Sequence, residues 1–476
     1  MIQGLISRFT FSYPRTLAYM LQASEYYVLD YFDWYHSTLD FSAVEKVGKL
    51  KYTKKAMVVL ATIWVEYLAM IAKVIWFTGS NLDAYGYWPL LTLLLVPFLL
   101  PYLAVIPVLV IKYLLQMPYE LMIANGLQAR IAVHRGVKIA VAGSYGKTTM
   151  REILRSVLGA DKKVAAPSGS INTLLGINSF MKKLDGDEDV LIFEIGEYYP
   201  GDVAHLARII QPDIGVITGI NEAHLKRFGS IEKTVATIYE LAAFLTGKPL
   251  FVNAENELAK SAARKGDILY SRAGCGELSV KDATSDLTGT TITIARGKET
   301  YVVKSQLLGL HLVGSIVAAV EVGLSLGIPM AKLVEGVAAT KPFPRRLELV
   351  SEKDDIAILD DSYNGNPDGV RAVLDFLTSL VGHRRLYITS GLVEMGDRSR
   401  EVHLQIGKEL TDAQIEVVML VRTSATKIIA EGLEGSGYKG NLMWFDDTDA
   451  AYAALPHLTV RGDVVLLQNN WPDQYK

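Results

Sequence analysis

The residues with the clearest chemical potential lie in one glycine-containing run near residue 145. Apart from Lys138, residues 137–142 are apolar and partly β-branched, which is typical of a buried strand, and the residues after the run favour a helix. Between them the chain reads Gly143-Ser144-Tyr145-Gly146-Lys147-Thr148-Thr149. Glycines at such a turn let backbone N–H groups face an anion, and a helix N-terminus adds positive potential. The run therefore predicts a phosphate-binding loop.

Lys147 and Thr148 suit this loop to a nucleoside triphosphate. A lysine here can reach the terminal phosphates, and a threonine hydroxyl can hold Mg²⁺. The sequence accordingly predicts ATP and Mg²⁺ as cofactors. The two glycines are closer together than in the general P-loop pattern, and a plain turn before a helix would explain Gly143 and Gly146 alone.

Two further side chains are candidate metal ligands. Glu194 ends an apolar strand-like run, and a carboxylate at the carboxyl end of a parallel strand points into the ligand crevice. Burial there is costly unless a cation is near, so we expect either a metal ion or a structural ion pair. His224 follows a predicted strand ending at Thr218. Its imidazole could bind Mg²⁺ or orient a substrate carboxylate, and an ordinary loop histidine is the alternative.

The bulk composition limits the class of protein. The chain has 476 residues, half of them hydrophobic, with a formal net charge of −3 and a single cysteine, Cys275. This length allows about three domains. A nearly neutral chain gives no reason to expect a nucleic acid partner. One cysteine excludes an internal disulfide and fits a reducing compartment.

Two apolar segments predict a transmembrane hairpin. Residues 57–78 carry only Glu66 and Lys73 as charged residues, and residues 88–111 carry none. Each segment can cross a hydrocarbon core of about 30 Å, although two buried core helices would show the same pattern. Lysines precede the first segment and are absent from the connector at 79–87, so the positive-inside rule places both ends in the cytoplasm. We expect a cell-membrane protein with cytoplasmic catalytic domains and the lipid bilayer as a partner.

The pattern divides the chain into five segments. Residues 1–55 are rich in aromatic side chains and would form either interfacial helices or a helical cap on the soluble body. The hairpin spans 56–114, and a linker spans 115–135. Strand-like and helix-like stretches then alternate, which predicts a central α/β domain over 136–341 and a smaller, doubly wound α/β domain over 342–476.

The expected fold class is therefore α/β: a P-loop central domain and a smaller C-terminal domain, preceded by a helical hairpin. Pro342-Phe343-Pro344 marks the boundary between the two domains. Residues 277–305 alternate in polarity and predict a small antiparallel ribbon. The main strands are expected at 138–142, 163–166, 190–195, 214–218, 249–252, 356–359, 386–389, 417–421, 442–445 and 464–467.

Taken in order, the motifs resemble the Mur ligase family over about residues 136–465. Singly most are weak, but the block from Asp360 to Asp368 is close to diagnostic. The motifs are Gly143–Thr149, Glu194-Ile195-Gly196, Asn221–His224 with Phe228-Gly229-Ser230, Asn253–Asn256, Arg345–Glu348, Asp360–Asp368, and Glu394-Met395-Gly396 with His403.

The resemblance implies an ATP-dependent ligase that joins a carboxylate to an amine. In such an enzyme the substrate carboxylate attacks the γ-phosphate, and an amine then displaces phosphate from the acyl phosphate. The resemblance assigns catalysis to Lys147, His224 and Glu194, metal binding to Thr148, Glu194 and His224, and nucleotide binding to residues 143–149, Asn256, Arg346 and Asp361.

Three positions depart from the family pattern. The family has a lysine that is carbamylated to bridge magnesium, and this chain has Ile238 there, which cannot bind metal. The motif Gly-x-His-Asn-x-x-Asn reads Gly309-Leu310-His311-Leu312-Val313-Gly314-Ser315, without either asparagine. The last predicted strand is followed by Gln468-Asn469-Asn470 in place of a Lys-Gly/Ala-Ser segment. One member of the family uses D-alanyl-D-alanine as the amine, and this difference leaves another amine open for this chain.

The N-terminal region bears on the substrate. In the family a soluble N-terminal domain binds the UDP-sugar, where this chain has the aromatic segment and the hairpin. We expect a membrane-anchored ligase of peptidoglycan precursor synthesis. Its substrates would be a lipid-linked or UDP-linked muropeptide and an amino acid or dipeptide. Two alternatives are a ligase for a polyglutamate-type product and a nucleotide-binding scaffold without activity.

Overall fold

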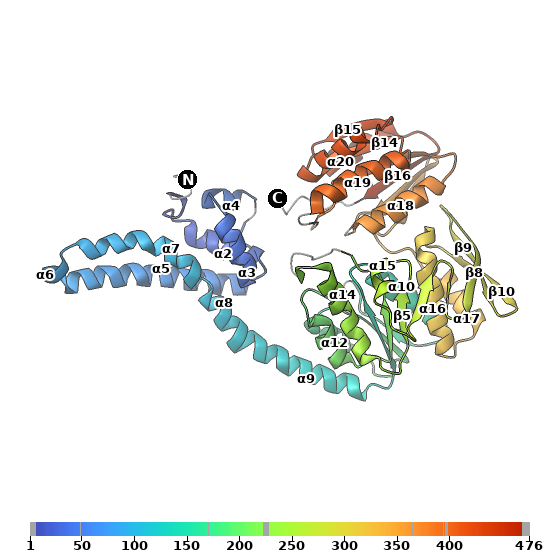
Figure 1. Cartoon of the computed structure of the whole chain (residues 1–476), viewed down its shortest axis with the longest axis horizontal. Coiled ribbons are helices and arrows are strands. Elements are labelled where there is room, and N and C mark those ends of the chain that lie inside the picture. The colour runs from blue at the N-terminus through green and yellow to red at the C-terminus, as the bar shows by residue number, and fades with distance from the viewer. Residues whose placement is uncertain are drawn as a thin grey trace. The chain divides into compact units, whose positions relative to one another are not determined.

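The computed structural model describes residues 6–47, 49–169, 171–221, 228–363, 365–393, 395 and 398–468. The chain divides into two compact units, one ending at Met122 and the other beginning at Ile123. Figure 1 labels the helices and strands of each unit.

The first unit is built from helices in its described part. Helix α5 is its longest element, with 27 residues, and its N-cap is Thr53, whose side chain accepts a hydrogen bond from the backbone N–H of Ala56. At 1.5 Å per residue this helix is about 40 Å long. The elements are α2 (Tyr13–Ala23), α3 (Val28–Ser37), α4 (Phe41–Val47), α5 (Lys54–Ser80), α6 (Leu82–Tyr85), η1 (Trp88–Leu95), α7 (Val96–Leu103), α8 (Ile106–Val110) and η2 (Ile111–Gln116).

The second apolar segment is not one regular α-helix. This corrects the expectation of a hairpin of two regular helices. It runs as a 3₁₀ stretch, two short α-helices and a π-helical turn. The physical reason is proline, which removes a backbone donor and disturbs the preceding turn. Prolines occupy positions 89, 97, 101 and 107, and Pro101 lies inside α7.

The aromatic segment packs on the hairpin. Tyr13, Leu17 and Tyr31 share a buried core with Val59 of α5 and Leu100 of α7. The hydroxyl of Tyr31 donates a hydrogen bond of 3.1 Å to the carbonyl oxygen of Pro101. Neither expected role for this segment, interfacial helices or a cap on the soluble body, anticipated this core with the hairpin.

The second unit contains two α/β domains. The first is organised around a ten-stranded sheet in the order β10-β9-β8-β7-β6-β5-β4-β1-β3-β2, parallel from β6 to β2. Its strands are β1 (Val137–Ala142), β2 (Val164–Ala165), β3 (Val190–Glu194), β4 (Ile214–Ile217), β5 (Leu250–Asn253), β6 (Ile268–Ser271), β7 (Gly274–Cys275), β8 (Leu278–Asp286), β9 (Gly289–Arg296) and β10 (Glu299–Ser305). The predicted ribbon is present, as β8 to β10, and it continues this sheet through β7.

Helices cover both faces of this sheet because successive residues of a strand point to opposite sides. Ile139 and Val141 of β1 share a core with α10, η4, α16 and α17, while Ala140 and Ala142 share a core with α9, α11, α12, α14, η3 and α15. The helices are α9 (Met117–Val133), α10 (Lys147–Leu158), α11 (Leu174–Met181), α12 (Asp202–Ile210), α14 (Ile231–Tyr239), η3 (Glu240–Phe244), α15 (Glu257–Ser261), η4 (Leu310–Leu312), α16 (Val313–Ser325) and α17 (Met330–Ala338).

The expected linker at 115–135 is largely helical. Helix α9 buries Leu127 and Ile131 in the same core cluster as Ala140 and Ala142. The second half of this helix is therefore a structural layer of the central domain.

The C-terminal domain has a six-stranded sheet in the order β11-β12-β16-β13-β14-β15, in which only β11 is antiparallel. Its core lies mainly between the sheet and α18, α19 and α20, and α21 covers the other face. The elements are β11 (Glu348–Lys353), β12 (Ile356–Asp361), β13 (Arg384–Thr389), β14 (Val417–Val421), β15 (Asn441–Phe445), β16 (Asp463–Gln468), α18 (Pro367–Ser379), α19 (Ser399–Asp412), α20 (Ser424–Gly435) and α21 (Thr448–Leu458).

The strand order decides where a ligand can sit. Strand β1 lies between β3 and β4, with Val141 opposite Glu194 and Ala142 opposite Ile217. Because the three strands are parallel, their carboxyl ends meet at one edge of the sheet. The glycine run after β1 and the segment after β3 are therefore neighbours in space, as expected at a switch point of an open sheet.

Candidate nucleotide-binding site

The predicted phosphate loop forms a tight turn between β1 and α10. Gly143 has φ of +144° and Gly146 has φ of +79°, conformations that favour glycine. A Cβ on Gly143 would collide with the Thr218 side chain. The backbone N–H of Ser144 donates to the carbonyl oxygen of Gly219 at 2.7 Å. The loop is therefore held against the segment after β4, directly before the N-terminus of α10.

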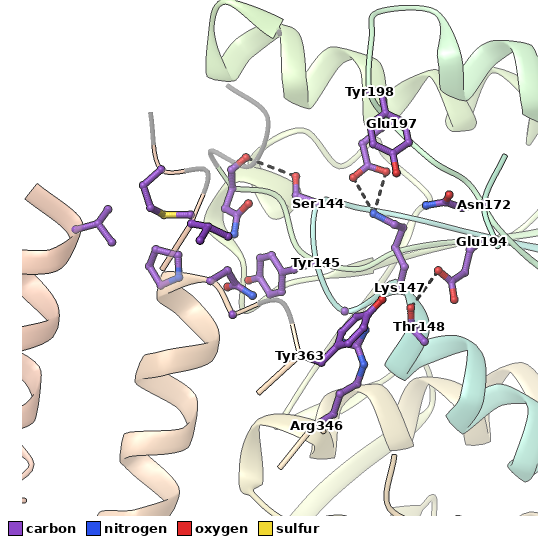
Figure 2. Close-up of a pocket in the computed structure, with 18 of the residues that line it drawn as sticks. Ser144, Tyr145, Lys147, Thr148, Asn172, Glu194, Glu197, Tyr198, Arg346 and Tyr363 are labelled. Carbon is purple, nitrogen blue, oxygen red and sulfur yellow. Dashed lines mark hydrogen bonds and ion pairs between the residues drawn. The ribbon is translucent and has the colours of Figure 1, made fainter. Parts of the chain in front are cut away.

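A cavity of about 260 Å³ lies beside this loop and is lined by both domains of the second unit. Figure 2 shows Lys147 and Thr148 on one side and Arg346 with Tyr363 nearby. The lining residues are Ser144, Tyr145, Gly146, Lys147, Thr148, Asn172, Glu194, Glu197, Tyr198, Asn221, Arg346, Tyr363, Gly365, Asn366, Pro367, Val393, Met395, Arg398 and Val402. Gly143 and Thr149 of the predicted loop flank this set.

The ammonium group of Lys147 is paired within the protein. Its Nζ lies 2.7 Å and 2.9 Å from the two carboxylate oxygens of Glu197, and it also contacts the carbonyl oxygen of Gly143. Both side chains are largely withdrawn from water, with 12% of Lys147 and 4% of Glu197 exposed. Burial raises the pKa of Glu197, and the charge on Lys147 opposes that rise. A lysine that can meet phosphate thus already faces an anion.

Glu194 lies beside the first residues of α10. Its expected partner was either a metal ion or a structural ion pair. The Thr148 hydroxyl donates to its Oε2 at 3.1 Å, and Nη1 of Arg151 lies 2.6 Å from its Oε1. The expected structural ion pair is therefore present. Burial raises the pKa of Glu194, while Arg151, Thr148 and Lys147 act in the opposite direction.

The donor set fits a magnesium ion. Mg²⁺ prefers hard oxygen ligands and takes only one or two carboxylates from a protein, the rest being water and phosphate oxygens. The Thr148 hydroxyl and the Glu194 carboxylate supply two such oxygens at the cavity wall. These two residues would hold the ion in this chain.

Arg346 brings a cation from the C-terminal domain. Its guanidinium carbon lies 4.8 Å from the centre of the Tyr363 ring, an arrangement typical of a cation–π contact. Arg346 precedes β11, and Tyr363 follows β12. The pairing of these two strands therefore places the charge at the cavity.

Two predicted nucleotide ligands lie outside the cavity lining. Asn256 caps α15 by accepting from the N–H of Ala259 at 2.9 Å, and its Nδ2 donates to the carbonyl oxygen of Ile220. Asp361 accepts hydrogen bonds from the N–H of Leu347 and from Nε2 of Gln468. Burial raises the pKa of Asp361 to about 6. In this structure both side chains are occupied by contacts within the protein.

The remaining motif residues divide into two groups. His224 lies outside the described residues, as does much of its motif. His403 is buried and its Nε2 accepts from the N–H of Leu392, so it braces a loop of the C-terminal domain. Ile238 is fully buried in the core of the central domain, and Glu240 caps the N-terminus of α12 by accepting from Gly201 and Ala204.

Sequence reasoning missed Glu197, which the structure places against Lys147. The available signal was a second acidic residue three positions after Glu194, just beyond an apolar strand. Tyr363 and Asn366 were also missed as individual lining residues, although both lie within the block from Asp360 to Asp368. Asn366 accepts a hydrogen bond from the N–H of Gly369 and caps α18.

Family models match most of the second unit. The model of the Mur ligase middle domain matches residues 141–323, and that of the Mur ligase, glutamate ligase domain matches residues 345–468. The first contains the glycine run, Glu194 and Glu197, and the second contains Arg346 and Asp361.

Curated relatives carry the same name in many bacteria. The UDP-N-acetylmuramoyl-tripeptide--D-alanyl-D-alanine ligase of Bacillus subtilis is 25% identical over 332 residues, covering 69% of this chain and 72% of the relative. The ligase of that name from Mycobacterium tuberculosis is 28% identical over 371 residues, covering 73% and 72%.

Solved structures share the fold. MurF from Acinetobacter baumannii has a TM-score of 0.63 at 23% identity, covering 74% of this chain and 77% of that chain. MurF from Thermotoga maritima in complex with ADP has the same score and identity, covering 74% and 80%. The matched domains, with a phosphate loop beside a two-domain cavity, lead to one conclusion: this chain belongs to the Mur ligase family and is an ATP-dependent ligase of the Mur type.

Proposed function

We propose that this protein is a membrane-anchored ligase that joins the carboxylate of a muropeptide to the amine of an amino acid or dipeptide, through an acyl phosphate, in peptidoglycan precursor synthesis. The observation that carries the proposal is the cavity in which Lys147 and Thr148 of the central domain lie together with Arg346 of the C-terminal domain. The curated relatives are named UDP-N-acetylmuramoyl-tripeptide--D-alanyl-D-alanine ligases, and this name favours a dipeptide as the amine.

The residues suit phosphoryl transfer, which needs charge neutralisation and alignment more than a protein nucleophile. The loop N–H groups and the N-terminus of α10 would receive the phosphates of ATP. Lys147 and Arg346 would offset their negative charge from two sides. Magnesium, when bound at Thr148 and Glu194, supplies further neutralisation of the phosphate oxygens. His224 is proposed as a further magnesium ligand from the family motif alone.

The reaction would proceed in two displacements. A carboxylate oxygen of the substrate attacks the γ-phosphorus, and ADP leaves. The amine nitrogen then attacks the acyl carbon, a tetrahedral intermediate collapses, and phosphate leaves as the nitrogen loses a proton. Because water competes with the amine for the acyl phosphate, contact between the two domains around the cavity would protect the intermediate.

Membrane anchoring rests on the surface of the first unit. By length and composition Lys54–Ser80 and Trp88–Val133 could each cross a membrane. Their most apolar stretches of 18 residues have mean hydropathies of 1.9 and 2.6, and 11% and 44% of these stretches are buried. Exposed apolar surface of this extent is unfavourable in water. The exposed side chains include Val58, Val65, Leu68, Ile75, Trp76, Leu91, Leu94, Leu95 and Leu99.

The polar ends of the hairpin agree with this placement. Exposed aromatic residues lie around its tip, at Trp76, Tyr85, Tyr87 and Trp88, as at a membrane–water interface. Lysines are found at the opposite end, including Lys55, whose Nζ lies 4.0 Å from the centre of the Tyr26 ring.

Phosphate release by the full-length protein in lipid nanodiscs tests the proposed function. The assay would combine ATP, Mg²⁺ and D-alanyl-D-alanine with either a UDP-linked or a lipid-linked muropeptide, and the product would be identified by mass. We expect release that requires both substrates and is abolished by Lys147→Ala. Nucleotide binding without turnover in any mixture would overturn the ligase and favour a scaffold. Full turnover with other acids or amines would overturn the assigned substrates.

A further inference from the structure

Glu197 is paired with Lys147, and a bound nucleotide would draw this lysine away from it. Glu197 lies in the segment after β3, lines the cavity and is almost completely buried. Its two oxygens contact Lys147 at 2.7 Å and 2.9 Å, and Figure 2 shows this pair at the phosphate loop. In the free protein the pair satisfies both charges.

A triphosphate changes this balance. The phosphates would draw Lys147 toward themselves, because the lysine follows directly on the loop that receives them. Glu197 would then be a buried carboxylate beside the negative charges of Glu194 and of the phosphates. Leaving a buried charge without a partner is strongly unfavourable. A cation that arrives together with the nucleotide would therefore favour the release of Lys147.

Among the residues that the structure describes, the neighbouring cations do not meet this need. Arg151 is committed to Glu194 at 2.6 Å and also contacts Gly169 and Glu152. Arg346 lies against the ring of Tyr363, and Nη2 of Arg398 lies 2.7 Å from Oε1 of Glu401. A divalent cation bound to the phosphates is the positive charge that would enter the cavity with ATP.

We propose that Glu197 becomes a ligand of a second divalent cation when nucleotide draws Lys147 away, in addition to the cation held at Thr148 and Glu194. The inference rests on the proposed function, because it requires a triphosphate at the loop. Glu197 would give this chain a metal ligand at the cavity that Ile238, buried in the core, and Glu240, engaged in capping α12, do not supply. The occupant of the site is a hard divalent ion such as Mg²⁺ or Mn²⁺.

The test counts bound metal instead of following turnover. Mn²⁺ binding to the full-length protein in nanodiscs would be measured by electron paramagnetic resonance with and without a non-hydrolysable ATP analogue. We expect the analogue to add two Mn²⁺ sites to the wild type and only one to Glu197→Gln. Glu240→Gln is the matched control, since this glutamate caps a helix nearby, and it should retain both sites.

A second measurement separates a lost ligand from a damaged fold. Without divalent cations, Glu197→Gln should bind the analogue about tenfold more tightly than the wild type, because Lys147 no longer has a carboxylate to leave; this equals about 1.4 kcal/mol. Glu197→Asp keeps the charge and should retain two Mn²⁺ sites, one of them weakened. A protein that fails to fold could give neither the tighter binding of Glu197→Gln nor the two metal sites of Glu197→Asp.

The outcomes distinguish the two proposals. If the wild type does not bind the analogue at all, the proposed function fails. If it binds the analogue normally but Glu197→Gln keeps the same number of Mn²⁺ sites, the function stands and the role of Glu197 is wrong. Unchanged affinity of Glu197→Gln in the absence of metal would equally overturn the release of Lys147.

Discussion

Nη1 of Arg151 lies 2.6 Å from Oε1 of Glu194, with only 2% and 1% of the two side chains exposed. Arg151→Met would leave the carboxylate without this partner, so we expect the free energy of unfolding to fall by about 3–5 kcal/mol. Arg151→Met combined with Glu194→Gln should recover much of that loss, because neither charge is then present. Denaturant unfolding of Arg151→Met, Glu194→Gln and the double variant, followed by far-ultraviolet circular dichroism, checks this.

Strict additivity would contradict the pairing. If the double variant loses the sum of the two single losses, Arg151 and Glu194 stabilise the fold independently, and the short contact carries no coupling energy.

Glu188 predicts that the fold loses stability at acidic pH, for a reason that does not involve the nucleotide-binding site. Its Oε2 lies 2.9 Å from Nε2 of His134, and it also accepts from the backbone N–H groups of Asp185 and Gly186. Burial alone would raise its pKa, but these hydrogen bonds outweigh burial and lower the pKa from 4.5 to about 2. A lowered pKa stabilises the fold above the unfolded value of 4.5, and the stabilisation is lost as pH falls from there toward 2.

The comparison with Glu188→Gln isolates this contribution. The wild type should exceed the variant by at most about 3 kcal/mol near pH 6, from about 1.4 kcal/mol per pKa unit, and the gap should close as pH approaches 2. Urea unfolding at a series of pH values measures it. A gap that is constant with pH would show that packing, and not ionisation, is responsible.

The fold of the catalytic part was largely predictable because its strands carry local signals. Each buried strand of the central domain is a short apolar run, and Glu194 stands out because a carboxylate ends one of these runs. The antiparallel ribbon was visible in the alternation of residues 277–305. Its continuity with the main sheet was not, because strand pairing depends on neighbours distant in the chain.

The site was less predictable for the same reason. Glu197 follows β3 in a segment with no regular period, and its partner, Lys147, is fifty positions earlier in the chain. Asn256 belongs to a recognisable motif, but its amide is engaged by Ile220 and Ala259, which a motif cannot reveal. In the first unit the sequence showed two apolar segments long enough to cross a membrane. Prolines at four positions of the second segment interrupt the regular helix that its length predicted.

The conformation of the phosphate loop predicts that only glycine is tolerated at position 143. The φ of +144° at Gly143 disfavours other residues, and a Cβ would meet Oγ1 of Thr218. Gly143→Ala should therefore displace the loop and weaken nucleotide binding at least tenfold, measured by titration calorimetry with an ATP analogue. Gly435→Ala is the control, since nothing lies within 4 Å of the added carbon, and alanine at the end of α20 should leave binding unchanged. Equal binding by both variants would contradict the constrained loop.

Leu68 predicts how the first unit meets the bilayer. It lies near the middle of α5 with 57% of its surface exposed, where a lipid-facing side chain is expected. An arginine at the centre of a spanning helix costs about 3 kcal/mol on insertion scales. Leu68→Arg should therefore lower the fraction of protein that floats with liposomes, whereas Val381→Arg, at a position 90% exposed in the C-terminal domain, should not. Flotation of both variants at the wild-type level would place Leu68 outside the bilayer, and failure of the wild type to float would overturn the anchor itself.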